Sequence, residues 1–210
     1  TRLVVGSVRM CIRDRVVGVA VYLITRKKSS NKKSFWTAKT MAVGAMCMAL
    51  SSVLSLIKLW PMPMGGSVTP ASMLPLLLFA YCYGVGPGMV LGALYGVMQF
   101  LLDGMAWAAL GAIPNLLDYP IAFGLLGLAG CFRGSKAKMT AGFVLGCFGR
   151  FMASFLSGFI FYGQYAPEGV NPVWYSLTYN GSYMLVECII CIALGLLVGE
   201  RLAKELKKVA

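Results

Sequence analysis

Long hydrophobic stretches, separated by short polar connections, make up most of this chain. A transmembrane helix needs about 20 mainly apolar residues, and the pattern predicts six such helices, with five or seven as the alternatives. The second and third are short, and Pro87 between two glycines favours a tight turn at their junction. The predicted spans are Lys39–Trp60, Ala71–Gly84, Gly86–Leu102, Asn115–Phe132, Ala141–Tyr165 and Ser176–Leu202.

The composition agrees with an integral membrane protein of one domain. Hydrophobic residues make up 59% of the 210 positions and charged residues 12%, and the mean hydropathy is +0.76. A soluble domain of this composition would expose a large apolar surface to water. The net charge of +12 does not indicate a nucleic-acid partner, since most basic residues lie at span ends and termini. We expect an all-α membrane protein, a six-transmembrane-helix bundle in the lipid bilayer.

Lysine and arginine are distributed unevenly among the predicted connections. They precede the first span, lie between the fourth and fifth, and follow the sixth, whereas the connections after the first, third and fifth spans hold only Lys58. The positive-inside rule then places both termini in the cytoplasm and the loops with Trp60, Trp107 and Trp174 outside. These tryptophans form either an interfacial aromatic belt or a stacking surface for a ligand.

The N-terminal residues differ from the rest. The apolar run Val16–Ile24 is too short to span a membrane, and no small-residue cleavage site of a signal peptide follows it. We assign no function to residues 1–33, and an artefact of sequence assembly is one interpretation of the run Met10–Arg15. The expected membrane domain covers residues 34–210.

The sequence disfavours an enzyme. It has no histidine, no G-x-x-x-x-G-K-[ST] phosphate loop and no G-x-S-x-G nucleophile elbow. Its C-x-x-C pair, Cys188 and Cys191, lacks the second pair or histidines that a zinc site needs, and is interpreted as small packing residues. We expect no metal and no redox cofactor.

Away from the span ends, ionisable residues remain at membrane depth: Asp118 in the outer part of the fourth span, Arg150 near the middle of the fifth and Glu187 near the middle of the sixth. Each costs roughly 2.5–3.5 kcal/mol on insertion and therefore needs a partner. At about 1.5 Å per residue, Arg150 and Glu187 reach similar depths, and we predict that they pair. The pair either locks two helices together or closes the floor of a pocket.

Helical spacing groups further residues on shared faces. Arg150 and Ser154 are four residues apart, and Asn180 and Glu187 are seven apart, so each pair lies on one side of its helix. A carboxylate and an amide can bind an amino-heterocycle, while tyrosines can stack on a flat or cationic ring. These faces predict a pocket for a planar, polar small molecule.

Small residues form two stripes. Gly88, Gly92 and Gly96 recur every fourth residue of the third span and predict close packing of helices within the protein. A second stripe on the first span is interpreted either as internal packing or as a face for a partner. It consists of Ala38, Ala42, Ala45 and Ala49.

Five segments together form a recognisable pattern: Phe161–Ala166, Tyr175–Leu177, Asn180–Gly181, Leu117–Tyr119 and Gly124–Arg133. They resemble the thiamine-specific substrate-binding subunit of energy-coupling-factor (ECF) vitamin transporters. The resemblance implies a six-helix subunit of the bacterial plasma membrane that captures thiamine from outside. It further implies delivery through a shared module of one transmembrane coupling subunit and two ATPases.

The resemblance also implies roles for individual residues. The family's acidic residue for the aminopyrimidine falls on Asp118, and its basic residue on Arg150. Its A-x-x-x-A face for the coupling subunit falls on Ala45 and Ala49. Together with the polar residues above, the candidate substrate-binding residues are Trp60, Asp118, Tyr119, Arg150, Ser154, Tyr162, Gln164, Tyr165, Tyr175, Asn180 and Glu187.

The chain departs from the family pattern in the pocket. Ser154 stands where the family has a histidine, Asp118 where a glutamate is usual, and Glu187 has no expected counterpart. Thiamine, a precursor such as the hydroxymethylpyrimidine, and a related heterocycle all fit this altered pocket. Two other classes are a stand-alone secondary transporter or channel for a small solute, and a membrane scaffold in which these polar residues are structural.

Overall fold

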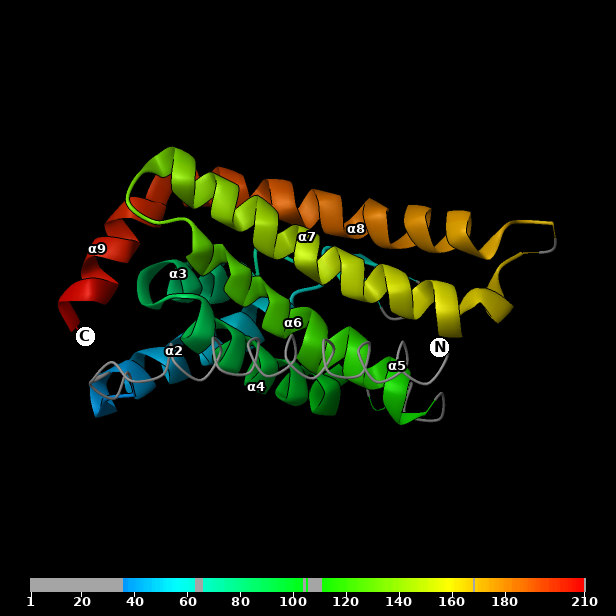
Figure 1. Ribbon diagram of the computed structural model, residues 1–210, viewed down its shortest axis with the longest axis horizontal. Helices are drawn as coiled ribbons and strands as arrows, with labels where there is room; N and C mark the ends of the chain where they lie inside the picture. Colours follow the sequence, from blue (N-terminus) through cyan, green and yellow to red (C-terminus); the bar gives the residue numbers. More distant parts are fainter. Residues whose placement is uncertain (1–35, 63–65, 104, 106–110, 168, 210) are drawn as a thin grey trace, which may run out of the picture. The chain divides into compact units, whose positions relative to one another are not determined.

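The fold is built from helices, in a computed structural model that describes residues 36–62, 66–103, 105, 111–167 and 169–209 (Figure 1). The predicted N-terminal segment, residues 1–33, and Trp107 lie outside the described residues. The helical elements are α2 (Ala38–Leu56), α3 (Leu74–Tyr83), α4 (Val85–Asp103), α5 (Ala112–Leu116), the π-helical turn η2 (Leu117–Ile121), α6 (Ala122–Leu125), the 3-10 turn η3 (Leu126–Cys131), α7 (Lys136–Phe161), the 3-10 turn η4 (Gly163–Tyr165), α8 (Pro172–Leu194), the π-helical turn η5 (Gly195–Gly199) and α9 (Glu200–Val209). Two short antiparallel strands, β1 (Trp60–Pro61) and β2 (Ser67–Val68), lie between α2 and α3.

Five helical stretches within the described residues are long and apolar enough to cross a membrane. They are Ala38–Leu56, Val85–Asp103, Ala112–Cys131, Lys136–Phe161 and Pro172–Leu206. Five of the six predicted spans therefore have a membrane-length helix at the predicted place, and the chain has the predicted all-α architecture.

The second predicted span, Ala71–Gly84, is a shorter helix than expected. Helix α3 has only 10 residues, all of them buried, and this length alone does not cross a bilayer. Ala71 has a φ of 65°, a left-handed conformation that keeps it out of the helix, and Gly84 ends the helix with a φ of 107°.

Glycines let α4 lie directly against the backbone of the fourth helical stretch. A Cβ added at Gly92 would lie 2.2 Å from the carbonyl oxygen of Phe123, and one added at Gly96 would lie 2.4 Å from that of Tyr119. A side chain larger than hydrogen has no room there. This contact is the packing role that the glycine stripe predicts.

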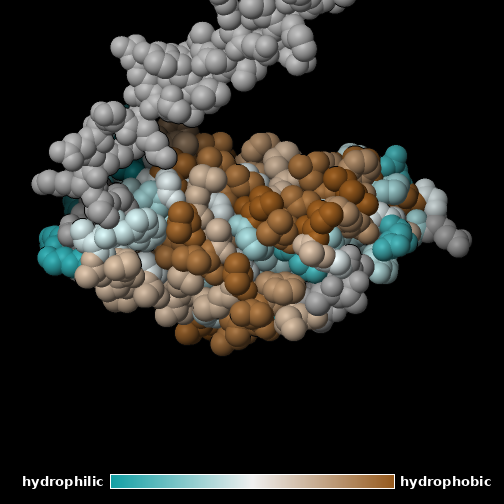
Figure 2. Space-filling model, turned by 60° about the horizontal axis from the view of Figure 1, so that its bottom comes forward, coloured by the Kyte–Doolittle hydropathy of each residue, from teal (hydrophilic) through white to brown (hydrophobic). Residues whose placement is uncertain are grey.

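The two longest helices, α7 and α8, run side by side and are connected by residues 162–171 (Figure 1). Helix α9 and the beginning of α7 lie at the opposite end of the bundle. Figure 2 shows hydrophobic residues across the middle of one face and hydrophilic residues gathered towards its two ends. Exposed apolar side chains such as Met46, Leu101 and Leu197 fit such a belt, because lipid, unlike water, imposes no cost on them.

Candidate functional site

A cavity of about 1000 Å³, its open mouth included, lies among the helices at the end where α4 ends and α8 begins. Five segments of the bundle supply its walls: the end of α2, the β2 loop, α4, the η2 and α6 region, and the α7–α8 pair. The polar residues that line it include Ser55, Thr69, Ser72, Tyr95, Gln99, Asp103, Asp118, Tyr119, Arg150, Ser154, Tyr162, Tyr175, Ser176, Tyr179, Asn180, Tyr183 and Glu187.

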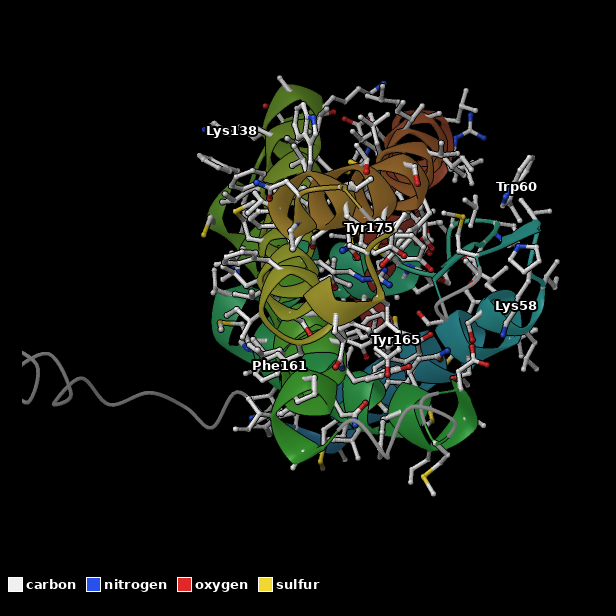
Figure 3. All side chains as sticks on the ribbon, turned by 90° about the vertical axis from the view of Figure 1, so that its right-hand side faces the viewer. Lys58, Trp60, Lys138, Phe161, Tyr165 and Tyr175 are labelled. Carbon is white, nitrogen blue, oxygen red and sulfur yellow. The ribbon has the colours of Figure 1, made fainter. Side chains whose placement is uncertain are left out.

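Eight of the eleven candidate substrate-binding residues line this cavity. They are Asp118, Tyr119, Arg150, Ser154, Tyr162, Tyr175, Asn180 and Glu187. The other three lie outside its lining: the side chains of Trp60 and Tyr165 are 68% and 48% exposed, and Gln164 is exposed as well. In the view onto the α7–α8 connection, Tyr175 lies among the helices and Trp60 stands at the outer edge (Figure 3).

The floor of the cavity holds the predicted ion pair. Arg150 Nη1 lies 3.5 Å from Glu187 Oε2, which confirms that the two residues pair. The Thr69 hydroxyl donates a hydrogen bond to Glu187 Oε1, and Ser72 Oγ donates another at 2.9 Å. The Arg150 guanidinium also lies over the ring of Phe123, 4.2 Å from its centroid. The buried Glu187 carboxylate therefore has three partners, namely Arg150, Thr69 and Ser72, as a charge away from water requires.

Asp118 approaches the cavity from the π-helical turn η2. Pro120 lies inside this turn and has no backbone N–H, so the regular α-helical hydrogen bonding cannot continue through it. The turn directs Asp118 towards α7, where Ser157 Oγ donates a hydrogen bond to its carboxylate at 2.7 Å. Asp118 thereby presents a carboxylate at the cavity wall.

Asn180 is fixed by the two helices it joins. Its amide nitrogen donates to the carbonyl oxygens of Ser154 and Ser176, at 3.4 and 3.1 Å, and its amide oxygen accepts a hydrogen bond from Tyr183 at 3.2 Å. The side chain is thereby held in place before any ligand arrives. Such preorganisation lowers the entropic cost of binding.

A polar network on the α4 side of the cavity was not predicted from the sequence. Tyr95 donates to Gln99 Oε1 at 3.1 Å, Gln99 donates to Asp103 at 3.3 Å, and Lys58 forms a salt bridge of 2.8 Å with Asp103. These three residues of α4 recur every fourth position, so their spacing was a readable signal. Thr69 and Ser72 were missed too, and no periodic pattern marks them because they lie in a loop and a turn.

The alanine stripe of α2 lies away from the cavity. Ala45 and Ala49 are exposed, as are Ala38 and Ala42, whereas Val43 and Cys47 on the other side of the helix are buried. The stripe is therefore not used for packing among the described residues.

Comparison with known proteins identifies the family. A model of the thiamine transporter protein family matches residues 41–206, which is most of the chain. The chain belongs to the thiamine transporter family. Family members include the thiamine transporter ThiT of Bacillus subtilis, 38% identical over 144 residues that cover 62% of this chain and 73% of the relative. The ThiT of Lacticaseibacillus paracasei is 33% identical over 134 residues, which cover 57% of this chain and 67% of that protein.

Solved structures agree on the fold. ThiT from Listeria monocytogenes superimposes with a TM-score of 0.70, at 21% identity over 80% of this chain and 96% of that one. The S component of a bacterial ECF transporter gives a TM-score of 0.56, at 20% identity over 80% and 98% of the two chains. With the membrane-length helices, these findings make the chain a multi-pass protein of the cell membrane, in a family of transporters rather than enzymes.

Proposed function

We propose that this protein is the thiamine-binding S subunit of an ECF transporter, which takes the vitamin from outside and passes it through a shared ATPase module. The observation that carries the proposal is the cavity, where the Asp118 carboxylate lies among tyrosines in a chain of the thiamine transporter family. Thiamine is a cation with an aminopyrimidine and a thiazolium ring. A carboxylate and stacked aromatic rings are the groups that such a ligand needs.

In this proposal each wall has a task. Asp118 accepts hydrogen bonds from the amino group of the pyrimidine, with Asn180 and Tyr175 on the same ring. Tyr162 and Tyr119 supply aromatic faces. The resemblance implies a histidine at position 154, and the smaller Ser154 leaves more open space there. Because the pocket is altered in this way, the pyrimidine half of thiamine should be compared with thiamine as a ligand.

The proposed topology has six spans with both termini in the cytoplasm, and α3 is the short second span. Basic residues support this orientation, because Arg133, Lys136 and Lys138 precede or begin α7 and Arg201 and Lys204 lie on α9. Both regions lie at the end of the bundle away from the α7–α8 connection (Figure 1). The cavity mouth is then on the outer side.

The proposed partner surface is the exposed alanine stripe of α2, centred on Ala45 and Ala49. Small side chains allow another helix to approach closely within a membrane, where no hydrophobic effect drives helices together. We propose that the transmembrane coupling subunit docks here. The two ATPases then supply the energy that this chain has no motif to provide.

Uptake into proteoliposomes tests the function and separates it from a stand-alone transporter. Vesicles with this chain alone are expected to bind radiolabelled thiamine without accumulating it. Vesicles with the chain, a coupling subunit, the two ATPases and internal ATP are expected to accumulate it. Accumulation by the chain alone would instead establish a secondary transporter, and no binding in either preparation would remove thiamine as the ligand.

A further inference from the structure

The cavity carries more acid than base. Among the described residues that line it, Asp103, Asp118 and Glu187 are acidic, and Arg150 is the basic one. Asp103 is paired with Lys58, and Glu187 is paired with Arg150. No salt bridge to Asp118 occurs within the described part of the chain, where Ser157 donates a hydrogen bond to it and the hydroxyls of Ser154 and Tyr162 also interact with it. The cavity is thus left with one uncompensated negative charge.

We propose that Glu187 is a specificity-determining residue that sets the charge of the ligand this cavity accepts. It cancels the charge of Arg150, so that the Asp118 carboxylate remains to attract a ligand with a single positive charge. This inference rests on the proposed function and extends it to a residue with no direct part in the binding of either ring.

Both carboxylate oxygens of Glu187 have polar partners. Its side chain is 1% exposed, and the hydroxyls of Thr69 and Ser72 both donate to Oε1. Hydrogen bonds to the ionised form stabilise the carboxylate in its buried position. Its other oxygen, Oε2, faces Arg150.

The contact between Glu187 and Arg150 acts through charge. Nε and Nη1 of Arg150 are buried and have no hydrogen-bond partner among the described residues, although Nη1 lies 3.5 Å from the carboxylate. At this distance in a low-dielectric interior the Coulomb attraction is strong without a well-formed hydrogen bond. An uncompensated guanidinium at the floor would instead repel any cation that enters.

The size of the effect follows from Coulomb's law. At an effective dielectric constant of about 20, Coulomb's law gives a roughly tenfold to thirtyfold change in the affinity for a cation held on the order of 10 Å from a unit charge. The same charge leaves the affinity for a neutral ligand of the same shape nearly unchanged. The ratio of the two affinities therefore isolates the charge from any loss of packing.

The test compares thiamine with 3-deazathiamine, in which a neutral ring replaces the thiazolium, by isothermal titration calorimetry. Glu187→Gln keeps an oxygen for Thr69 and Ser72 and removes the charge. The expected result is that affinity for thiamine falls at least about tenfold more than affinity for 3-deazathiamine. An equal loss for both ligands would show that Glu187 only holds the cavity floor together, and would overturn the proposal.

Two further variants keep the result interpretable if Glu187→Gln destabilises the protein. The double variant Arg150→Gln with Glu187→Gln removes both charges and leaves that of Asp118, so its ratio of affinities is expected to return to within about threefold of the parent's. A ratio that stays low would contradict charge cancellation. Glu205→Gln, at an exposed site on α9, is the matched control and should change neither affinity.

These measurements distinguish failure of the proposed function from failure of the proposed role of Glu187. A parent protein that binds neither ligand would refute the proposed function. A parent protein that binds thiamine, with a ratio unchanged by Glu187→Gln, would refute the role of Glu187 alone.

Discussion

Gly96 affects both the packing of the helix bundle and the shape of the cavity. Gly96 lies on α4, about one turn before Gln99, which lines the cavity. It faces the backbone of η2. A Cβ at this position would lie 2.4 Å from the carbonyl oxygen of Tyr119 and 2.8 Å from the Cα of Pro120. Both neighbours are backbone atoms, so no side-chain rotation can relieve the overlap.

Gly96→Ala is therefore expected to push η2 away from α4. A comfortable contact between these atoms needs about 1 Å more, and overpacking of this kind costs typically about 1–3 kcal/mol. For a chain of this length that corresponds to a fall in melting temperature of roughly 3–10 °C. Since η2 carries Asp118 and Tyr119, affinity for thiamine should fall as well.

The assay is thermal unfolding of the purified protein in detergent, with and without thiamine, followed by calorimetric titration. Gly86→Ala is the matched control on the same helix, because a Cβ there has no atom within 4 Å. The control should keep the parent's melting temperature and affinity. A Gly96→Ala protein as stable as the control, and binding thiamine as tightly, would refute the close contact between α4 and η2.

Three other predictions concern substitutions in the cavity and on the exposed face of α2. Asp118→Asn should lower thiamine affinity roughly tenfold to hundredfold in calorimetry, because a charge-assisted hydrogen bond becomes a neutral one; unchanged affinity would place the aminopyrimidine elsewhere. Tyr162→Trp should increase thiamine-dependent fluorescence quenching above that of the parent, since position 162 lines the cavity whereas the tryptophans of the described residues, Trp36, Trp60 and Trp174, do not; a quenching titration compares the two proteins, and equal quenching would argue against it. Ala45→Leu with Ala49→Leu should keep thiamine binding and abolish module-dependent uptake, whereas the control Ala193→Leu, exposed on α8, should affect neither; normal uptake by the double variant would exclude this face as the docking surface.

Much of the architecture could be predicted from the sequence, because lipid limits what a backbone can do. Long apolar stretches must be helices there, and this principle located the five membrane-length helices. The same cost of burial predicted the Arg150–Glu187 pair, since two charges at similar depth need one another. The second span was predicted to start at Ala71, whereas α3 begins at Leu74. Hydropathy does not register the left-handed conformation of Ala71, which delays the start of the helix.

The cavity was only partly predictable for a related reason. Periodicity finds residues on regular helices, and it grouped Arg150 with Ser154 and Asn180 with Glu187. It does not find groups that a loop or turn brings in, such as Thr69 and Ser72. It also does not reveal that the π-helical turn at Pro120 directs Asp118 towards Ser157.

The most direct test of the central claim is a calorimetric titration of the purified full chain with thiamine. We predict saturable binding of one thiamine per chain in the nanomolar range, weakened by Asp118→Asn and unchanged by Glu205→Gln. Absence of binding by the folded protein, or binding that Asp118→Asn leaves unchanged, would contradict a thiamine site in this cavity.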